Sequence, residues 1–196
     1  MNYYPMDPEF LFSISPFVTQ DSSRFAVIKP TKTERKQLPQ DADAIVIPIP
    51  PEFARHNVLI EVLGAGQRQA EAYHANSLML SLAENYGRLE VRDDPGNKPL
   101  PKTYVKVYAR LKNGQVRYFK DGYTDLRGRF DYASLNSSEG SGGPPMPMTR
   151  GGGEGTGGIN HQMLAPQEIS EVEKLAILIL SDTHGALVRE AAPPNE

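Results

Sequence analysis

The chain's clearest strand pattern is Tyr104-Val105-Lys106-Val107-Tyr108-Ala109-Arg110-Leu111. Every second residue from Val105 to Leu111 is apolar, and the residues between them carry hydroxyl or charged groups. Because successive side chains of a strand point to opposite faces, this spacing predicts a strand with one buried and one outward face.

An Asn-Gly pair, Asn113-Gly114, follows this strand and predicts a two-residue hairpin turn. Such a pair tolerates the positive φ that both central positions of a type I′ turn require. The chain would then return as an antiparallel strand over residues 116–120. Counting outward from the turn, we expect Leu111 to pair with Val116, Arg110 with Arg117, Ala109 with Tyr118 and Tyr108 with Phe119.

The outward face of this hairpin is the best candidate binding surface in the sequence. We expect it to carry a cationic stripe with aromatic residues between the charges: Lys106, Tyr108, Arg110, Arg117 and Phe119. The plainer interpretation is a solvated face or one that packs against another domain. The alternative interpretation is a binding surface for an acidic peptide or a glycan, because two facing arginines repel each other unless an anion lies between them. Nucleic acid is not expected, because the stripe is short and the chain carries a net charge of -3.

Other apolar runs predict further strands on both sides of the hairpin. Short β-branched runs at 25–28, 44–49 and 58–63 indicate strands. Prolines that follow the second run predict that it is an edge strand or that it stops where the prolines begin. Residues 67–84 are compatible with a helix or with strands, and we favour strands that follow a hairpin turn at Gly64-Ala65-Gly66. The continuous apolar run 175–180 predicts a strand buried on both faces, which a turn connects to residues 186–189.

These elements together predict an all-β protein with two tandem β-sandwich-like units. The content of 17 Gly and 17 Pro favours strands and turns over helices. We expect an irregular N-terminal arm over 1–23, a first unit over 24–85, a second unit over 86–190 and a tail over 191–196. The Gly-rich residues 137–160 have too little apolar surface to offset the entropy of ordering, so we expect a long disordered loop there.

Four segments in the second unit occur in a recognisable order: Gly87-Arg88-Leu89-Glu90-Val91, Asn97-Lys98-Pro99-Leu100-Pro101, residues 104–109, and Thr124-Asp125-Leu126-Arg127-Gly128-Arg129-Phe130. This order resembles the carboxypeptidase regulatory-like and transthyretin-like (prealbumin-type) sandwich modules. The resemblance implies a prealbumin-like sandwich over about residues 87–135.

The last of these segments contains a turn whose residues have structural roles. We expect Thr124 and Asp125 to open it, with Asp125 accepting backbone N–H groups two or three residues on. Gly128 would take a conformation that a side chain penalises, and Phe130 would fill the core. These roles concern the fold and say little about function.

Enzymes that share this fold provide the alternative to a structural role. Intradiol dioxygenases, which the resemblance includes, bind iron through two Tyr and two His. The four histidines, His56, His74, His161 and His184, have none of the spacings that metal sites commonly use. Zero Cys excludes thiolate-bound metals and disulfides. We therefore expect no metal, no cofactor and no catalytic residue.

The function expected from the sequence is that of a non-catalytic structural or binding module. The chain has no apolar run long enough to span a membrane. Its partners would be other protein domains or chains of a larger assembly, with a glycan as an alternative, and its setting would be extracytoplasmic or at the cell surface.

Overall fold

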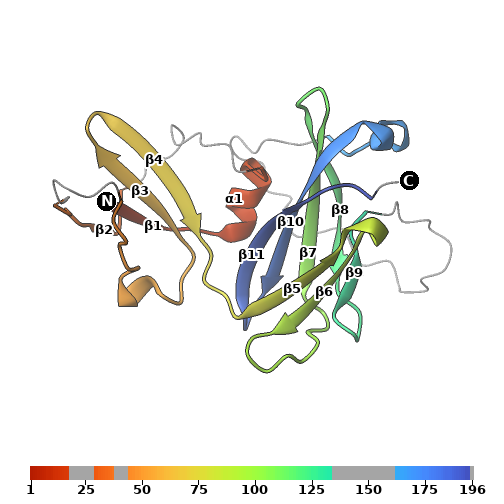
Figure 1. The fold of residues 1–196 in the computed structure, drawn as a ribbon, viewed down its shortest axis with the longest axis horizontal. Helices are drawn as coiled ribbons and strands as arrows, with labels where there is room; N and C mark the ends of the chain where they lie inside the picture. Colours follow the sequence, from red (N-terminus) through yellow and green to blue (C-terminus); the bar gives the residue numbers. More distant parts are fainter. Residues whose placement is uncertain (18–28, 38–43, 134–161, 195–196) are drawn as a thin grey trace, which may run out of the picture.

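The computed structural model describes residues 1–17, 29–37, 44–133 and 162–194, and these form an all-β protein of two tandem units (Figure 1). The two units and their β character agree with the fold class expected from the sequence. The expected loop at 137–160 and the expected strand at 25–28 lie outside the described residues. None of the described helices has the length and hydropathy that a membrane span needs.

The first unit contains a single four-stranded sheet among its described residues. Its strands are β1 (Asn2–Pro5), β2 (Lys32–Thr33), β3 (Val58–Gly64) and β4 (Gln67–Tyr73), in the order β2-β1-β3-β4. The two-residue turn Ala65-Gly66 joins β3 to β4, with φ of 48° and 75°. These positive values at both central positions are those of a type I′ turn, so the expected hairpin is confirmed.

Two segments of the first unit differ from expectation. Residues 44–49 form no strand, because Pro48, Pro50 and Pro51 remove backbone donors from any ladder there. The N-terminal residues are not irregular: they form β1 and the helix α1 (Pro8–Ile14). Asp7 caps this helix by accepting the backbone N–H groups of Glu9 and Phe10.

The second unit is a sandwich of two antiparallel sheets (Figure 1). One sheet has the order β11-β10-β7-β8, made from β7 (Tyr104–Leu111), β8 (Val116–Tyr123), β10 (Val172–Ser181) and β11 (Gly185–Ala191). The other has the order β5-β6-β9, made from β5 (Leu78–Ala83), β6 (Arg88–Asp93) and β9 (Arg129–Asp131). Short 3₁₀ segments occur at Pro51–Phe53, Glu84–Tyr86 and Pro166–Glu171.

The core of this sandwich consists of the inward residues of both sheets. Val91 of β6 and Val107 of β7 are fully buried in it, as are Ile177 and Ile179 of β10. Strand β10 lies between β7 and β11, and its alternate residues Ala176 and Leu178 are buried on the other face. The expectation that residues 175–180 form a strand buried on both faces is therefore confirmed.

The observed pairing moves strand β5 from the first unit to the second. Leu78 pairs with Asp93 and Ala83 pairs with Arg88, so β5 and β6 form one hairpin. A boundary at 85/86 would separate these partners. We place it instead in the link between β4 and β5, residues 74–77.

The hairpin β7–β8 has a different turn from the one expected. Gly114 has φ of 82°, but Asn113 is not among the residues with positive φ. The N–H of Gly114 donates to the carbonyl of Leu111, and the N–H of Leu111 donates to the carbonyl of Gln115. This is a three-residue loop, a turn followed by one left-handed glycine. The register is consequently shifted, and Arg110 pairs with Val116.

Candidate functional site

The outward face of strands β7 and β10 is covered by helix α1 and by the residues that follow it. Phe12 of α1 is 3% exposed, and its ring lies edge-on to Tyr108 with 5.6 Å between centroids. Phe17 is also buried, and the guanidinium of Arg110 lies 5.2 Å from the centre of its ring. Phe12, Phe17 and Tyr108 form one buried cluster with Leu178 of β10. This packing joins the first unit to the second.

Ionic and polar contacts surround the aromatic cluster. The ammonium of Lys106 lies 3.1 Å from a carboxylate oxygen of Glu9 and donates to Ser13 Oγ at 3.0 Å, both on α1. Arg110 Nε lies 3.2 Å from Glu173 Oε2. The positive charges of β7 thus have acidic partners within the chain.

The cationic stripe expected on the hairpin does not form a single surface. Lys106, Tyr108 and Arg110 lie on the outward face, as expected, but beneath α1 and Phe17. Arg117 and Phe119 lie on the opposite face, where Phe119 is buried in the sandwich core and Arg117 contacts Glu168 at 3.4 Å. The three-residue loop reverses these positions, because it shifts the register by one residue so that Ala109 pairs with Arg117 and Tyr108 with Tyr118. A bulge at the Val107–Tyr108 register shift restores the expected register beyond Phe119. The facing pair Arg110–Arg117 therefore does not exist.

The turn from Thr124 to Phe130 docks against strand β6. Asp125 accepts the backbone N–H groups of Arg127 and Arg129, each at 2.8 Å. These hydrogen bonds stabilise the ionised carboxylate and lower the pKa of Asp125, and the bond from the Arg129 N–H has the larger effect. Gly128 has φ of 72°, and its carbonyl accepts the N–H of Val91 at 2.8 Å. The turn is thereby fixed to the sheet by its own backbone.

The ends of this turn contact neighbouring groups. The Thr124 hydroxyl donates to the carbonyl of Leu100 at 2.6 Å and accepts the N–H of Thr103 at 3.0 Å. Phe130 is partly buried against the sandwich core, and the ammonium of Lys120 lies 5.3 Å from its ring centre. These contacts stabilise the fold of the second unit.

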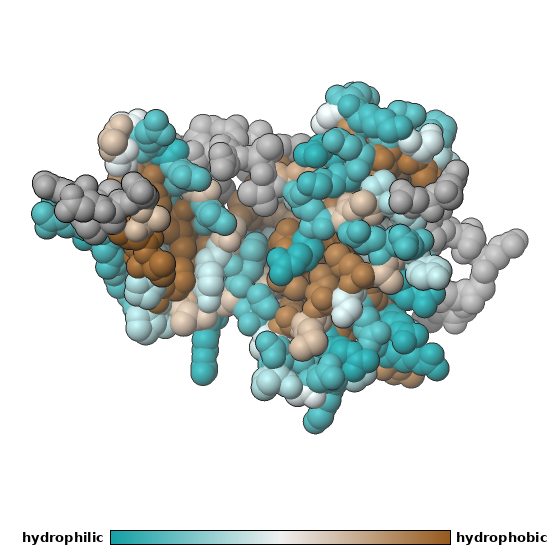
Figure 2. Space-filling view, viewed as in Figure 1, coloured by the Kyte–Doolittle hydropathy of each residue, from teal (hydrophilic) through white to brown (hydrophobic). Residues whose placement is uncertain are grey.

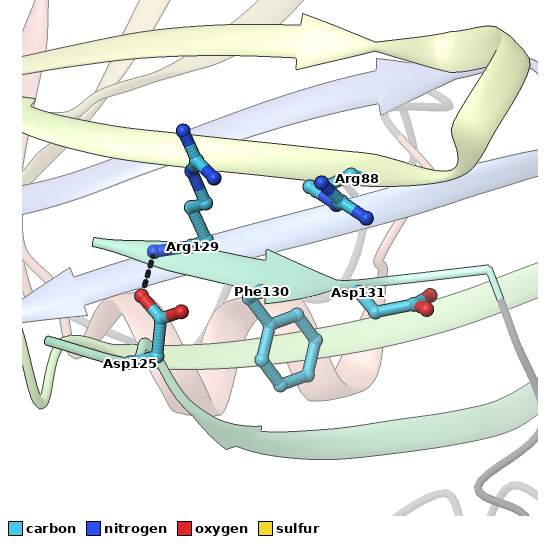
Figure 3. Close-up of a pocket in the computed structure, with 5 residues that line it drawn as sticks. All are labelled: Arg88, Asp125, Arg129, Phe130 and Asp131. Atoms are coloured by element: carbon cyan, nitrogen blue, oxygen red, sulfur yellow. Dashed lines mark hydrogen bonds between the residues drawn. The ribbon is translucent and has the colours of Figure 1, made fainter. Parts of the chain in front are cut away.

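A hollow of about 300 Å³ lies beside the turn, lined by Arg88, Asp125, Arg129, Phe130 and Asp131 (Figure 3). The close-up shows guanidinium and carboxylate groups of opposite sign around it, with the Asp125 carboxylate directed to the backbone N–H of Arg129. Arg129 also contacts Glu90 at 3.4 Å. The lining includes no hydroxyl or thiol nucleophile. The Asp125 carboxylate is already hydrogen-bonded to backbone N–H groups, and Asp131 is exposed. We assign no reaction to it.

The described histidines do not form a metal centre. His74 is largely buried, and burial lowers its pKa. His184 Nδ1 lies 2.7 Å from the hydroxyl of Thr183. Within the described ranges no three His, Cys, Asp or Glu side chains come together as metal ligands do. His161 lies outside those ranges.

The residues that the sequence argument missed are those of helix α1 and Phe17, which follows the helix. Glu9, Phe12 and Phe17 make the contacts between the two units, yet they lie in the segment expected to be irregular. A signal was present, because Asp7-Pro8-Glu9 is a typical helix start with a capping acid, a proline at the first position and an acid in the first turn.

A second joint lies where the link between β4 and β5 crosses the turn between β10 and β11. The N–H of Ser77 donates to the carbonyl of His184 at 2.8 Å, and the N–H of Ala186 donates to that of Ala75 at 3.3 Å. Gly185 lies between these two bonds and pairs with Asn76. The link between the units is thus bonded to the second unit's sheet.

Comparisons with known proteins agree with the two-unit division. Residues 77–196 match the family described as the AbpF C-terminal domain, and residues 1–60 match the AbpF seventh immunoglobulin-like domain. The chain is 37% identical over 195 residues to Actin-binding protein F of Dictyostelium discoideum; all of this chain is covered, but it spans only 7% of that protein's length. No solved structure matches the chain. Because the first of these family matches extends over more than half of the chain, the protein belongs to the AbpF C-terminal domain family.

Proposed function

We propose that this chain is a non-catalytic structural module of a larger actin-associated protein, in which its two units keep one relative orientation. The observation that carries the proposal is the position of α1, which belongs to the first unit by sequence and packs on β7 and β10 of the second. Buried aromatic contacts and the Lys106–Glu9 ion pair hold it there. If the two units moved freely on a flexible linker, the aromatic rings and the Lys106–Glu9 pair would be exposed to solvent. In a rigid spacer they stay in contact across the joint.

The likeness to Actin-binding protein F gives the proposal its setting. A module of such a protein would have other domains of the same assembly as partners and would work in the cytoplasm, where actin filaments are found. The extracytoplasmic setting and the glycan partner expected from the sequence find no support in the comparisons. The prealbumin-like interpretation stays as a proposal about the strand arrangement of the second unit.

A Phe12→Ala substitution tests the rigid joint. We expect it to weaken the packing of α1 by about 3 kcal/mol, because it removes a buried ring and leaves a cavity beside Tyr108. The radius of gyration of the full chain, measured by small-angle X-ray scattering, should increase as the units separate. Hydrogen exchange at the backbone of α1 should become faster.

Phe10→Ala provides the matched control, since Phe10 lies on the same helix but is 63% exposed. It changes the helix propensity in the same way without removing a buried contact, so we expect scattering like that of the unchanged chain. If both variants scatter alike, α1 does not hold the units together and the spacer proposal fails.

Direct contact with actin filaments is a second candidate function, favoured by the 37% identity to a protein named for binding actin. We expect the full chain to sediment with actin filaments and to stay in the supernatant when actin is omitted. Recovery in the supernatant at saturating filament concentration would remove this candidate and leave the structural one.

A further inference from the structure

Two connecting segments form one end of the second unit: the loop between β6 and β7, residues 94–103, and the turn after β8, residues 124–128 (Figure 1). We call them together the loop end. Backbone hydrogen bonds join the two segments. The N–H of Lys102 donates to the carbonyl of Thr124 at 3.0 Å, and the N–H of Thr124 donates to the carbonyl of Thr103 at 2.9 Å. The loop end is therefore one bonded structure rather than two independent loops.

The turn of the loop end presents an apolar side chain to solvent. Leu126 is 86% exposed, although its neighbours in the chain are held in place. Asp125 accepts two backbone N–H groups, and the carbonyl of Gly128 is bonded to β6. A single exposed leucine is common on protein surfaces. Leu126 differs because its backbone is already ordered, so a partner that binds it loses little entropy in fixing the turn.

The polar groups around Leu126 indicate the charge of a partner. The exposed basic residues of the loop end are Lys98, Lys102 and Arg127. Two acids beside them are bonded to backbone: Asp93 accepts the N–H of Lys98, and Asp125 accepts that of Arg127. A third acid, Asp94, is half-buried. Figure 2 shows this end of the unit as mainly hydrophilic, with a small hydrophobic area at its margin. A partner with acidic groups around an apolar recess would complement this arrangement.

The joint between the two units leaves the loop end available. Helix α1 packs on the outward face of β7 and β10, and the link between β4 and β5 is bonded to the turn between β10 and β11. Both contacts lie away from the bonds that join residues 94–103 to residues 124–128. The match of residues 77–196 to the AbpF C-terminal domain family includes the whole loop end.

We propose that the loop end is the surface through which the second unit contacts actin filaments. Leu126 enters an apolar recess of the filament, and the charges of Lys102 and Arg127 pair with acidic groups around that recess. This inference rests on the filament contact proposed above and adds the part of the chain that makes it. Loops fixed to the end of a rigid sandwich are a common place for binding residues.

The test is co-sedimentation of the full chain and its variants with purified actin filaments over a range of salt concentrations. We expect Leu126→Asp to weaken binding by at least about 30-fold, because it places an unpaired carboxylate in the apolar part of the contact. Arg127→Glu should weaken binding by about tenfold at low salt and by less at high salt, where exposed charges are screened. Both side chains are exposed, so the melting temperatures should stay close to that of the unchanged chain.

The matched controls are Tyr86→Asp and Arg55→Glu. Tyr86 is 79% exposed in the connection between β5 and β6, at the opposite end of the same unit, and Arg55 is an exposed basic residue of the first unit. We expect both variants to bind like the unchanged chain.

Three results would overturn the proposal. If Leu126→Asp binds filaments as well as the unchanged chain or no worse than Tyr86→Asp, the loop end is not the contact, although the filament contact itself stands. If the unchanged chain does not sediment with filaments, both proposals fail. If Leu126→Asp abolishes binding to vesicles of anionic lipid but leaves filament binding unchanged, the partner of the loop end is a membrane.

Discussion

Replacing Gly128 by alanine is expected to lower the free energy of unfolding of the second unit by about 4 kcal/mol. Gly128 has φ of 72°, a conformation that costs alanine roughly 1 kcal/mol. A Cβ atom built there would also lie 2.3 Å from the carbonyl oxygen of Val91 and 3.1 Å from the backbone nitrogen of Leu100. These are backbone atoms of the sheet and its following loop, so the whole turn must move.

Movement of the turn would break hydrogen bonds that hold it to β6. The N–H of Val91 donates to the carbonyl of Gly128, and the N–H of Leu100 donates to the carbonyl of Val91 at 3.0 Å. Each buried bond contributes about 1 kcal/mol, and an unsatisfied partner costs more. Urea unfolding followed by circular dichroism would measure the loss.

Gly114→Ala separates the backbone strain from the steric clash. Gly114 has φ of 82°, but nothing lies within 4 Å of the position that a Cβ would take. Alanine there should therefore cost only about 1 kcal/mol. Similar losses in the two variants would contradict the argument that the turn is locked against β6.

Replacing Gly185 by alanine is expected to have a second large effect, about 4 kcal/mol of stability and a loosened joint between the units. The added Cβ would lie 2.0 Å from the carbonyl oxygen of Ala75 and 3.0 Å from the Cα of Asn76. The turn between β10 and β11 must then move away from the link between β4 and β5. The two hydrogen bonds of this joint, from Ser77 to His184 and from Ala186 to Ala75, would be lost.

Hydrogen exchange would locate this effect. We expect faster exchange at the amides of Ser77 and Ala186, with the β3–β4 hairpin unchanged. Gly66→Ala is the control, because Gly66 has φ of 75° in another hairpin turn and nothing lies within 4 Å of its added Cβ. Unchanged protection at Ser77 in the Gly185 variant would show that the joint does not depend on this close approach.

The alternation of residues 104–111 and the apolar run 175–180 could be read directly from the sequence. Both patterns depend on the two-residue period of a strand, and the side chains face as that period requires. The hairpin at Ala65-Gly66 was also predictable, because a short glycine-containing turn between two strands has few geometries.

The hairpin at Asn113-Gly114 shows where local reasoning is insufficient. The same dipeptide is compatible with a two-residue and a three-residue loop, which differ by one residue in register. That difference placed Arg117 and Phe119 on the wrong face. Choosing between the loops requires the packing of Phe119 in the core, which involves residues far away in sequence.

The sequence alone was sufficient for the all-β class with two tandem units, for the strands at 104–111 and 175–180 and for the residues of the turn at 124–130, because these follow from local patterns. It was not sufficient for residues 44–49, which form no strand, or for the boundary between the units, because β5 pairs with β6. What covers the outward face of residues 104–110 could be determined only from the tertiary structure. Whether Tyr108 meets solvent, a partner or Phe12 depends on where a seven-residue helix almost a hundred positions earlier comes to lie. The energy of that contact is a burial energy, and burial is a property of the folded chain rather than of any local pattern.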